Sequence, residues 1–390
     1  MWRRVGAEPV GRVDTCPRHH VVARVALGVG RGARRAATVH CRGMTVTQLR
    51  TLLVTILVGA AALTATSPTA QADTDPVAAA HADARRAGSN DPRVREWIAY
   101  ESTSYRIRLV RPDGSGDHAL DDVTVGPEDN PDWSPDGRRI TFVGEGTDAM
   151  SAPGLWIVNA NGRGLRRLVR CTAPCQYLDD PAWSPDGRSI AYSRQAPDAT
   201  RGGTVEAVDV ATGRTRTLLA AGPGDFYAGV RWSPDGMSLV LEWVHASPTN
   251  YDDVTDVTLA RADIGGSNPV PFPLTEPGVF PQTADWAPSG DYISYASLPT
   301  ADALATDVYL IRSDGTGRTR LTTLRGFGGV HTDFTNDSEG VYFVELTATG
   351  PELRLVDIAT RLVTPVGSPA VAGFHPRTRP DAVAGDPLTP

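Results

Sequence analysis

The sequence predicts an all-β protein, a six-bladed β-propeller, on the basis of a repeated turn element, the alternating strands behind it and a turn-rich composition. The chain has 390 residues, of which 39 are glycine and 31 are proline. This balance suits many short strands joined by tight turns and disfavours long helices. A Trp-Ser-Pro-Asp-Gly element recurs at a spacing of 40 to 54 residues. Four antiparallel strands in a unit of that length make one propeller blade.

The repeated element is intact in three copies and degraded in three more. Each copy opens with an aromatic residue, and these residues lie 50, 49, 54, 48 and 40 positions apart. They are Trp133, Trp183, Trp232, Trp286, Phe334 and Phe374. Such regular internal repetition is the mark of a repeat architecture.

The chemistry of the element explains its form. Proline presets φ for a turn, aspartate bonds its own backbone, and glycine accepts the positive φ that closes a hairpin. The aromatic residue in front is a large apolar body that we expect to wedge between neighbouring sheets. The expected turn residues are Asp136, Gly137, Asp186, Gly187, Asp235, Gly236 and Gly290.

The count of strands predicts how the ring closes. Second strands of the units are expected near Trp97, Ile140, Ile190, Leu239, Tyr292 and Val341. The first of these has no turn element in front of it, and the element at Phe374 has no second strand behind it. We therefore expect the segment from Val371 to His375 to pair beside Trp97, which closes the ring and removes its exposed edges.

Residues 44–72 have the pattern of a signal peptide. Arg50 supplies a positive charge, an apolar run follows over 51–63, and Ala70-Gln71-Ala72 fits a cleavage site. The run is shorter than the about 20 residues that a membrane span needs. We expect cleavage and no stable span afterwards, with an uncleaved N-terminal anchor as the alternative.

The remaining boundaries follow from this signal. Residues 1–43 precede it, and they are interpreted as an extension from a start site placed too far upstream, or as a disordered basic arm. Residues 73–93 are expected to form a linker, 94–380 the propeller and 381–390 a C-terminal tail. The predicted protein is a secreted or envelope protein and a monomer.

The charge distribution argues against nucleic acid as a partner. Residues 1–72 hold ten arginines and two acidic residues, whereas the rest of the chain has 28 arginines and 43 acidic residues. A body this acidic repels phosphate backbones, because nucleic-acid binders need a basic patch.

The repeated Trp-Ser-Pro-Asp-Gly, followed by strands such as Ile190-Ala-Tyr, resembles the propeller repeat of the TolB-like, WD-type family of exported bacterial proteins. The resemblance covers nearly all of 94–380. It implies the propeller fold and a binding role at the cell envelope. TolB carries its own N-terminal domain before the propeller, and the short polar segment 73–93 departs from that pattern.

The search for catalytic motifs finds none. The sequence has no G-x-S-x-G, as peptidases with an attached hydrolase domain would have, and no H-E-x-x-H. We expect no catalytic residue, no metal and no cofactor. Calcium stays open as an alternative, because acidic segments at 128–130, 179–180 and 251–253 offer oxygen ligands without a calcium-loop pattern.

Cys171 and Cys175 are the two cysteines that follow the signal. Export places them in an oxidising compartment, where a disulfide is the expected state of such a pair. Two free thiols are the alternative.

One face of the predicted ring is favoured for binding. The Ser-Pro-Asp-Gly turns face one side and are short, whereas the other side carries longer, diverse loops, and binding residues concentrate on such loops. This second side is called the loop face below. Polar residues just before each aromatic should converge at the channel mouth there. The candidate ligand-binding residues are Asp129, Asp180, Tyr227, Gln282 and His331.

Two functions remain. The first is a binding or scaffold module for a protein, peptide or glycan. The alternative is a propeller lyase or hydrolase that acts on carbohydrate at the channel mouth. A cluster of histidines with carboxylates at the mouth favours the enzyme, and a mixed open face favours binding. A simpler interpretation is that the candidate residues line a water-filled channel and bind no ligand.

The signal-peptide interpretation predicts that residues 1–72 are absent from the mature protein. N-terminal sequencing of the exported form should begin near Asp73. A mature N-terminus well upstream of Met44 would contradict both the cleavage site and the proposed start site.

Overall fold

The computed structural model describes residues 20–29, 33–42, 96–120, 125–144, 153–266, 269–298, 305–324 and 328–380. The predicted signal peptide (44–72), linker (73–93) and tail (381–390) lie outside these residues. The chain divides into two compact units, Met1–Asp73 and Thr74–Pro390. In the first unit β1 (His20–Val29) pairs antiparallel with β2 (Ala33–Arg42). No helix among the described residues is long and apolar enough to cross a membrane.

The second unit is the predicted propeller of six four-stranded antiparallel blades. Blade 1 contains β26 (Gly373–Thr378), β3 (Ile98–Ser102), β4 (Ile107–Val110) and β5 (His118–Ala119). Blade 2 contains β6 (Glu128–Trp133), β7 (Arg139–Gly144), β8 (Gly154–Asn159) and β9 (Arg166–Arg170). Blade 3 contains β10 (Tyr177–Trp183), β11 (Ser189–Gln195), β12 (Thr204–Asp209) and β13 (Thr215–Ala220), with a short 3-10 helix at Ala199–Arg201.

The other three blades repeat this order. Blade 4 contains β14 (Phe226–Trp232), β15 (Ser238–Ser247), β16 (Asn250–Asp263) and β17 (Phe272–Pro273). Blade 5 contains β18 (Gln282–Trp286), β19 (Tyr292–Ser297), β20 (Asp307–Arg312) and β21 (Thr319–Arg320). Blade 6 contains β22 (Gly329–Phe334), β23 (Gly340–Thr347), β24 (Gly350–Asp357) and β25 (Val363–Pro365).

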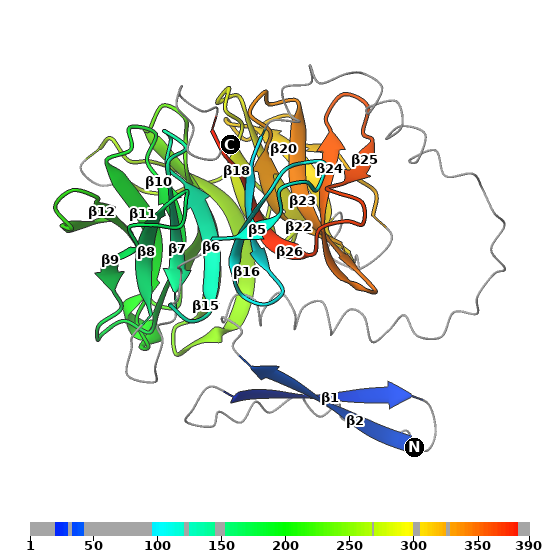
Figure 1. The fold of residues 1–390 in the computed structure, drawn as a ribbon. Helices are drawn as coiled ribbons and strands as arrows, with labels where there is room; N and C mark the ends of the chain where they lie inside the picture. The colour runs from blue at the N-terminus through cyan, green and yellow to red at the C-terminus, as the bar shows by residue number, and fades with distance from the viewer. Residues whose placement is uncertain are drawn as a thin grey trace, which may run out of the picture. The chain divides into compact units, whose positions relative to one another are not determined.

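The ring closes as the sequence predicts. Strand β26 is the innermost strand of blade 1 and pairs with β3, with Gly373 opposite Ser102 and Thr378 opposite Ile98. Figure 1 shows the red C-terminal strand β26 beside the cyan strands at the start of the propeller. The closure is therefore confirmed, and it joins residues from the two ends of the domain in one sheet.

The register corrects one detail of the predicted repeat. Phe374 does not occupy the aromatic position of the sixth copy, because it lies at the same place in its sheet as Asp129, four positions before Trp133. Thr378 takes the place of the aromatic residue instead. The Phe-His-Pro-Arg sequence imitates the repeat, but its proline corresponds to Pro131, two positions before the aromatic.

The Ser-Pro-Asp-Gly turns form closed hydrogen-bonded units. In blade 2 the Asp136 carboxylate accepts from the Ser134 hydroxyl at 2.6 Å and from the Arg138 amide at 3.1 Å. Gly137 has a φ of 62°, a conformation that favours glycine, and its amide donates to the Ser134 carbonyl. The same contacts recur in blades 3 and 4. The Ser184 hydroxyl and the Arg188 amide hold the pKa of Asp186 below its ordinary value.

The aromatic residue of each turn element packs between blades. Trp133 lies with Trp97 and Leu109 of blade 1 and with Phe142 of its own blade in one hydrophobic cluster. Its indole N–H donates to the Arg377 carbonyl of blade 1 at 3.1 Å. In the same way Trp232 donates to the Ala182 carbonyl of the preceding blade. Removing such a side chain costs about 3–5 kcal/mol in a typical core.

Deletion of residues 368–390 should strongly destabilise the propeller, because it removes β26 and leaves β3 as an open edge. A loss of several kcal/mol corresponds to a fall in melting temperature of about 10 °C or more, at roughly 2–4 °C per kcal/mol. The matched control removes only 381–390 and should melt like the full chain. Equal melting temperatures for both truncations, measured by circular dichroism, would refute the closure.

Candidate functional site

The innermost strand of every blade carries a β-bulge at the same place, three residues before the aromatic position. The residue at the bulge has φ between 45° and 59°, in the left-handed region. Non-glycine residues rarely adopt this conformation, and it is costly for a β-branched residue such as Thr283. The six residues, called the bulge ring here, are Asn130, Asp180, Gly229, Thr283, His331 and His375.

Hydrogen bonds connect the bulge ring from one blade to the next. The Asn130 amide donates to Asp179 at 2.5 Å, and the Gly229 backbone N–H donates to the Asp180 carboxylate at 2.7 Å. The His331 backbone N–H donates to the Thr283 hydroxyl at 2.7 Å. Left-handed bulges thus turn backbone N–H groups toward a polar side chain of the preceding blade.

The remaining links complete the circle. Gly229 has no side chain that could accept the backbone N–H of Thr283 in the next blade. The Glu242 carboxylate from β15 accepts this hydrogen bond instead. A Cβ atom at Gly229 would lie 2.8 Å from the Glu242 carboxylate, so the glycine makes room for it. The His375 backbone N–H approaches His331 Nδ1 at 3.4 Å, and His375 Nδ1 lies 3.3 Å from Asp129.

A second tier of carboxylates lies one position before the aromatic residues, toward the opposite face. Asp132 accepts the Trp183 backbone N–H at 2.7 Å, and Asp333 accepts the Thr378 backbone N–H at 2.6 Å. Asp285 accepts the Phe334 backbone N–H in the same manner. Two arginines at the equivalent position of other blades, Arg231 and Arg377, balance much of this negative charge.

The tier nearer the loop face has no arginine at the equivalent inner-strand positions. Its carboxylates belong to the inner strands and to the second strands of blades 1 and 4, and two histidines, His331 and His375, lie among them. Burial, and then the charge of Glu101, raises the pKa of Asp129 well above its ordinary value. Burial also lowers the pKa of His331 and His375, which favours neutral imidazoles. The carboxylates are Glu101, Asp129, Asp179, Asp180 and Glu242.

A compact histidine–carboxylate cluster stands out in this tier. His375 Nδ1 lies 3.0 Å from the Glu101 carboxylate and 3.3 Å from that of Asp129. One ligand atom from each of the three residues lies within 4.8 Å of the others. The His331 ring stacks on the His375 ring with centroids 3.8 Å apart. All four side chains are buried.

The structure brings together part of the predicted binding set. Asp180 and His331 belong to the bulge ring, and Asp129 lies next to it on β6. Gln282 is half-buried at the equivalent position of blade 5. Tyr227 lies apart from them, because its side chain packs in the hydrophobic cluster between blades 3 and 4. The three acidic segments considered as calcium ligands, 128–130, 179–180 and 251–253, all lie in strands, the first two in inner strands of the ring.

Two residues of the cluster are missed by sequence reasoning. Glu101 lies on a strand with no turn element in front of it, and His375 lies in the copy whose register the sequence misplaces. An alignment on the proline two positions before the aromatic would have placed His375 with Asn130 and Asp180. Nothing in the local sequence of Glu101 indicates that it faces the channel.

An aromatic shelf lies in blade 4 at its loop-face end, where Trp243 packs against the cluster between blades 3 and 4. The Trp243 indole N–H donates to Asp225 at 3.0 Å, and His245 Nδ1 lies 3.2 Å from the same carboxylate oxygen. The Trp243 and His245 rings have centroids 4.9 Å apart. Trp243 is paired with Tyr227, the second residue of the inner strand of blade 4. Asp225, Trp243 and His245 are half-buried and are called the Trp243 shelf.

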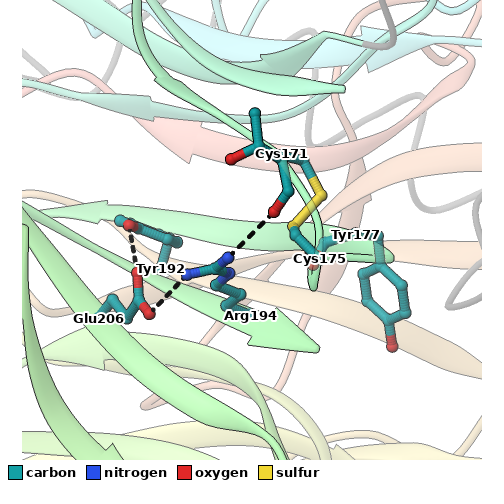
Figure 2. Close-up of a disulfide and its surroundings, with 7 residues drawn as sticks. Cys171, Cys175, Tyr177, Tyr192, Arg194 and Glu206 are labelled. Atoms are coloured by element: carbon teal, nitrogen blue, oxygen red, sulfur yellow. Dashed lines mark hydrogen bonds and ion pairs between the residues drawn. A yellow bond between two sulfur atoms is a disulfide. The ribbon is translucent and has the colours of Figure 1, made fainter. Parts of the chain in front are cut away.

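A disulfide fixes the connection that leads into the inner strand of blade 3. Cys171 and Cys175 are bonded, with their Cα atoms 5.3 Å apart (Figure 2). Arg194 donates to the Thr172 carbonyl within this connection and also pairs with Glu206 at 3.1 Å. The cross-link and the arginine together hold the loop-face end of blade 3 in a defined position.

The fold of this protein is similar to that of several proteins of known structure. No family model and no curated protein matches the sequence. The structure of TolB from Acinetobacter baumannii is similar with a TM-score of 0.59 and 14% identity, over 95% of this chain and 82% of that one. A propeller in a nidogen/laminin complex is similar with a TM-score of 0.53 and 12% identity, over 74% of this chain and 100% of that one.

A third structure, hydrazine synthase from Kuenenia stuttgartiensis, has a TM-score of 0.52 and 12% identity, over 74% of this chain and 47% of that one. These structures include a protein complex and an enzyme. The resemblance to TolB seen in the repeats therefore extends to the three-dimensional fold. It assigns a propeller and leaves the activity to be argued from the site.

Glu242 should make the stability of the propeller depend on pH. Burial, with a contribution from Asp180, raises its pKa from 4.5 to about 8. Between these values the folded state holds a proton that the unfolded state has lost, so the free energy of unfolding falls as the pH rises. We expect Glu242→Gln to lose less stability than the wild type between pH 5 and pH 8.

The control for this measurement is Glu352→Gln, which alters a half-buried glutamate paired with Arg354 at 2.7 Å on the outer part of blade 6. Thermal melts of the three proteins across the pH range give the comparison. Parallel profiles for the wild type and Glu242→Gln would contradict the assignment of a raised pKa.

Proposed function

We propose that this protein is an exported propeller that works as a binding module, and that its ligand lies on the loop face across the channel mouth. The observation that carries the proposal is the Trp243 shelf, a half-buried indole that packs beside Tyr227 at the loop-face end of blade 4. Its ring is held by Asp225, which leaves an apolar surface with polar edges beside it. Surfaces of this kind suit the faces of sugar rings and the side chains of peptides.

The scaffold around the shelf supports this role. The β15–β16 hairpin of blade 4 contains the longest strands of the propeller, and it carries two of the three shelf residues. The hydrogen-bonded bulge ring gives these loops a rigid base, and rigid bases with diverse loops are the usual arrangement of binding proteins. The proposed ligand is a protein, peptide or glycan outside the cytoplasm, and export is inferred from the signal-like sequence at 44–72.

The second candidate is an enzyme that acts on carbohydrate. The histidine–carboxylate cluster of His375, Glu101 and Asp129 favours it, because such groups can move protons. Their burial argues against it: His375 is 4% exposed and Glu101 is 0% exposed, which leaves a polymeric substrate little access. The binding role is therefore preferred.

The binding role can be tested with an immobilised peptide library and a glycan array. We expect Trp243→Ala to weaken capture of the best binder at least about tenfold, which corresponds to about 1.4 kcal/mol. His245→Ala should weaken it with a smaller effect on melting temperature, because the ring is 31% exposed. Release of cleaved sugar by the wild type would instead favour the enzyme.

The matched control is Met237→Ala, in the turn of the opposite face, where the side chain is 56% exposed. Capture that is lost in this variant and retained in Trp243→Ala would show that the ligand lies on the other face.

A further inference from the structure

Two buried acceptor atoms in blade 2 have no hydrogen-bond donor. Asp129 is 5% exposed, and its Oδ2 atom has no hydrogen-bond partner. The neighbouring Asn130 is 2% exposed, and its Oδ1 atom also lacks a donor. A buried carboxylate oxygen without a donor costs free energy comparable to a lost hydrogen bond, so a ligand that binds this oxygen would stabilise the site.

We propose that Glu101, Asp129 and His375 form a binding site for a divalent transition-metal ion of the Mn²⁺ or Zn²⁺ class. The three residues come from β3, β6 and β26 and offer two carboxylates and one imidazole nitrogen. A bound ion would supply the positive charge that the Asp129 carboxylate lacks. This assignment is independent of the ligand proposed for the loop face.

The distances between the ligand atoms fit one ion. Zn²⁺ binds histidine nitrogen and carboxylate oxygen at about 2.0–2.2 Å, and two ligands at right angles on such an ion lie about 3 Å apart. His375 Nδ1 lies 3.0 Å from the Glu101 oxygen and 3.3 Å from the Asp129 oxygen. Little movement is therefore needed for all three to reach a common ion.

The ligand set also selects the class of ion. Calcium and magnesium prefer oxygen ligands alone, whereas imidazole suits zinc and other transition metals, and carboxylates suit manganese. A mixed set of one nitrogen and two oxygens therefore favours Mn²⁺ or Zn²⁺ over Ca²⁺.

The scaffold holds these ligands before an ion arrives. The His375 backbone N–H approaches His331 Nδ1 at 3.4 Å, and the His331 ring stacks on the His375 ring. Asp129 is placed by the bulge of β6, and Glu101 by its pairing opposite Phe374 on the closing strand. The site exists only when the ring is closed, because β26 supplies one ligand and positions another.

The test uses the full chain after removal of metal with a chelator and dialysis. Mn²⁺ is titrated in while its electron paramagnetic resonance signal is recorded, and melting temperatures are measured with and without the ion. We expect one Mn²⁺ per chain, a rise in melting temperature on binding, and displacement by Zn²⁺ but not by an equal concentration of Ca²⁺. Failure of the wild type to bind Mn²⁺ or Zn²⁺ would overturn the proposal, as would tighter binding of Ca²⁺.

Two variants assign the ligands. Asp129→Asn and His375→Gln should each weaken binding on the order of 100-fold, since even supporting residues of metal sites contribute about 10- to 100-fold. The matched control is Asp132→Asn, which removes a buried carboxylate from the tier on the other side of the bulge and should bind normally. Binding in both ligand variants that equals that of the wild type would overturn the site.

Stability without metal separates this site from a purely structural cluster. Asparagine at position 129 removes a charge that burial disfavours, so metal-free Asp129→Asn should melt at or above the temperature of the metal-free wild type. Added Mn²⁺ should then raise the melting temperature of the wild type and leave that of Asp129→Asn unchanged. A variant that melts far below the wild type in chelator would show that the carboxylate stabilises the fold without an ion, and the assignment would be wrong.

Discussion

The propeller depends on one backbone constraint, the left-handed bulge that every inner strand makes three residues before its aromatic position. The bulge interrupts the ladder inside the blade, and in blades 1, 4, 5 and 6 its N–H group faces a polar side chain of the preceding blade. Each conformation is unfavourable for a non-glycine residue by itself. The hydrogen bonds between successive blades compensate for it, so the five strained residues and Gly229 are held together in a polar ring at the centre of the propeller.

The residues of each repeat contribute to two layers, an outer apolar layer between the blades and an inner polar layer around the channel. The aromatic residues, such as Trp133 and Trp183, pack in the apolar clusters between blades. The residues just before them, such as Asp129 and Asp180, pack toward the centre and supply directional bonds. The side chains at the inner positions differ from blade to blade, and these positions carry the charged groups of the candidate site.

The sequence predicts the outer layer well and the inner layer poorly. The turn element repeats because its geometry has few solutions, and so the blade count, the strands and the closure could all be predicted from it. Which side chains face the channel depends instead on the register of the innermost strand against the second strand. The turn element does not mark the bulge, and the proline that follows it in blades 1, 2 and 3 resembles the proline of the turn, which is why Phe374 is misplaced and His375 is overlooked. Glu101 reaches the cluster through strand pairing between distant parts of the chain, which no local pattern reports.

The closing strand has a consequence for how the domain is assembled. Strand β3 is the first strand of the propeller along the chain, and its inner neighbour β26 is the last. Blades 2 to 6 consist of consecutive segments and can form as each one becomes available during synthesis. Blade 1 must wait for the end of the chain, and pairing over so long a sequence separation is slow because a large loop has to close. The blade that is begun first is thus the last to be completed, and until then its apolar edge is the part of the molecule most exposed to misassembly with another copy.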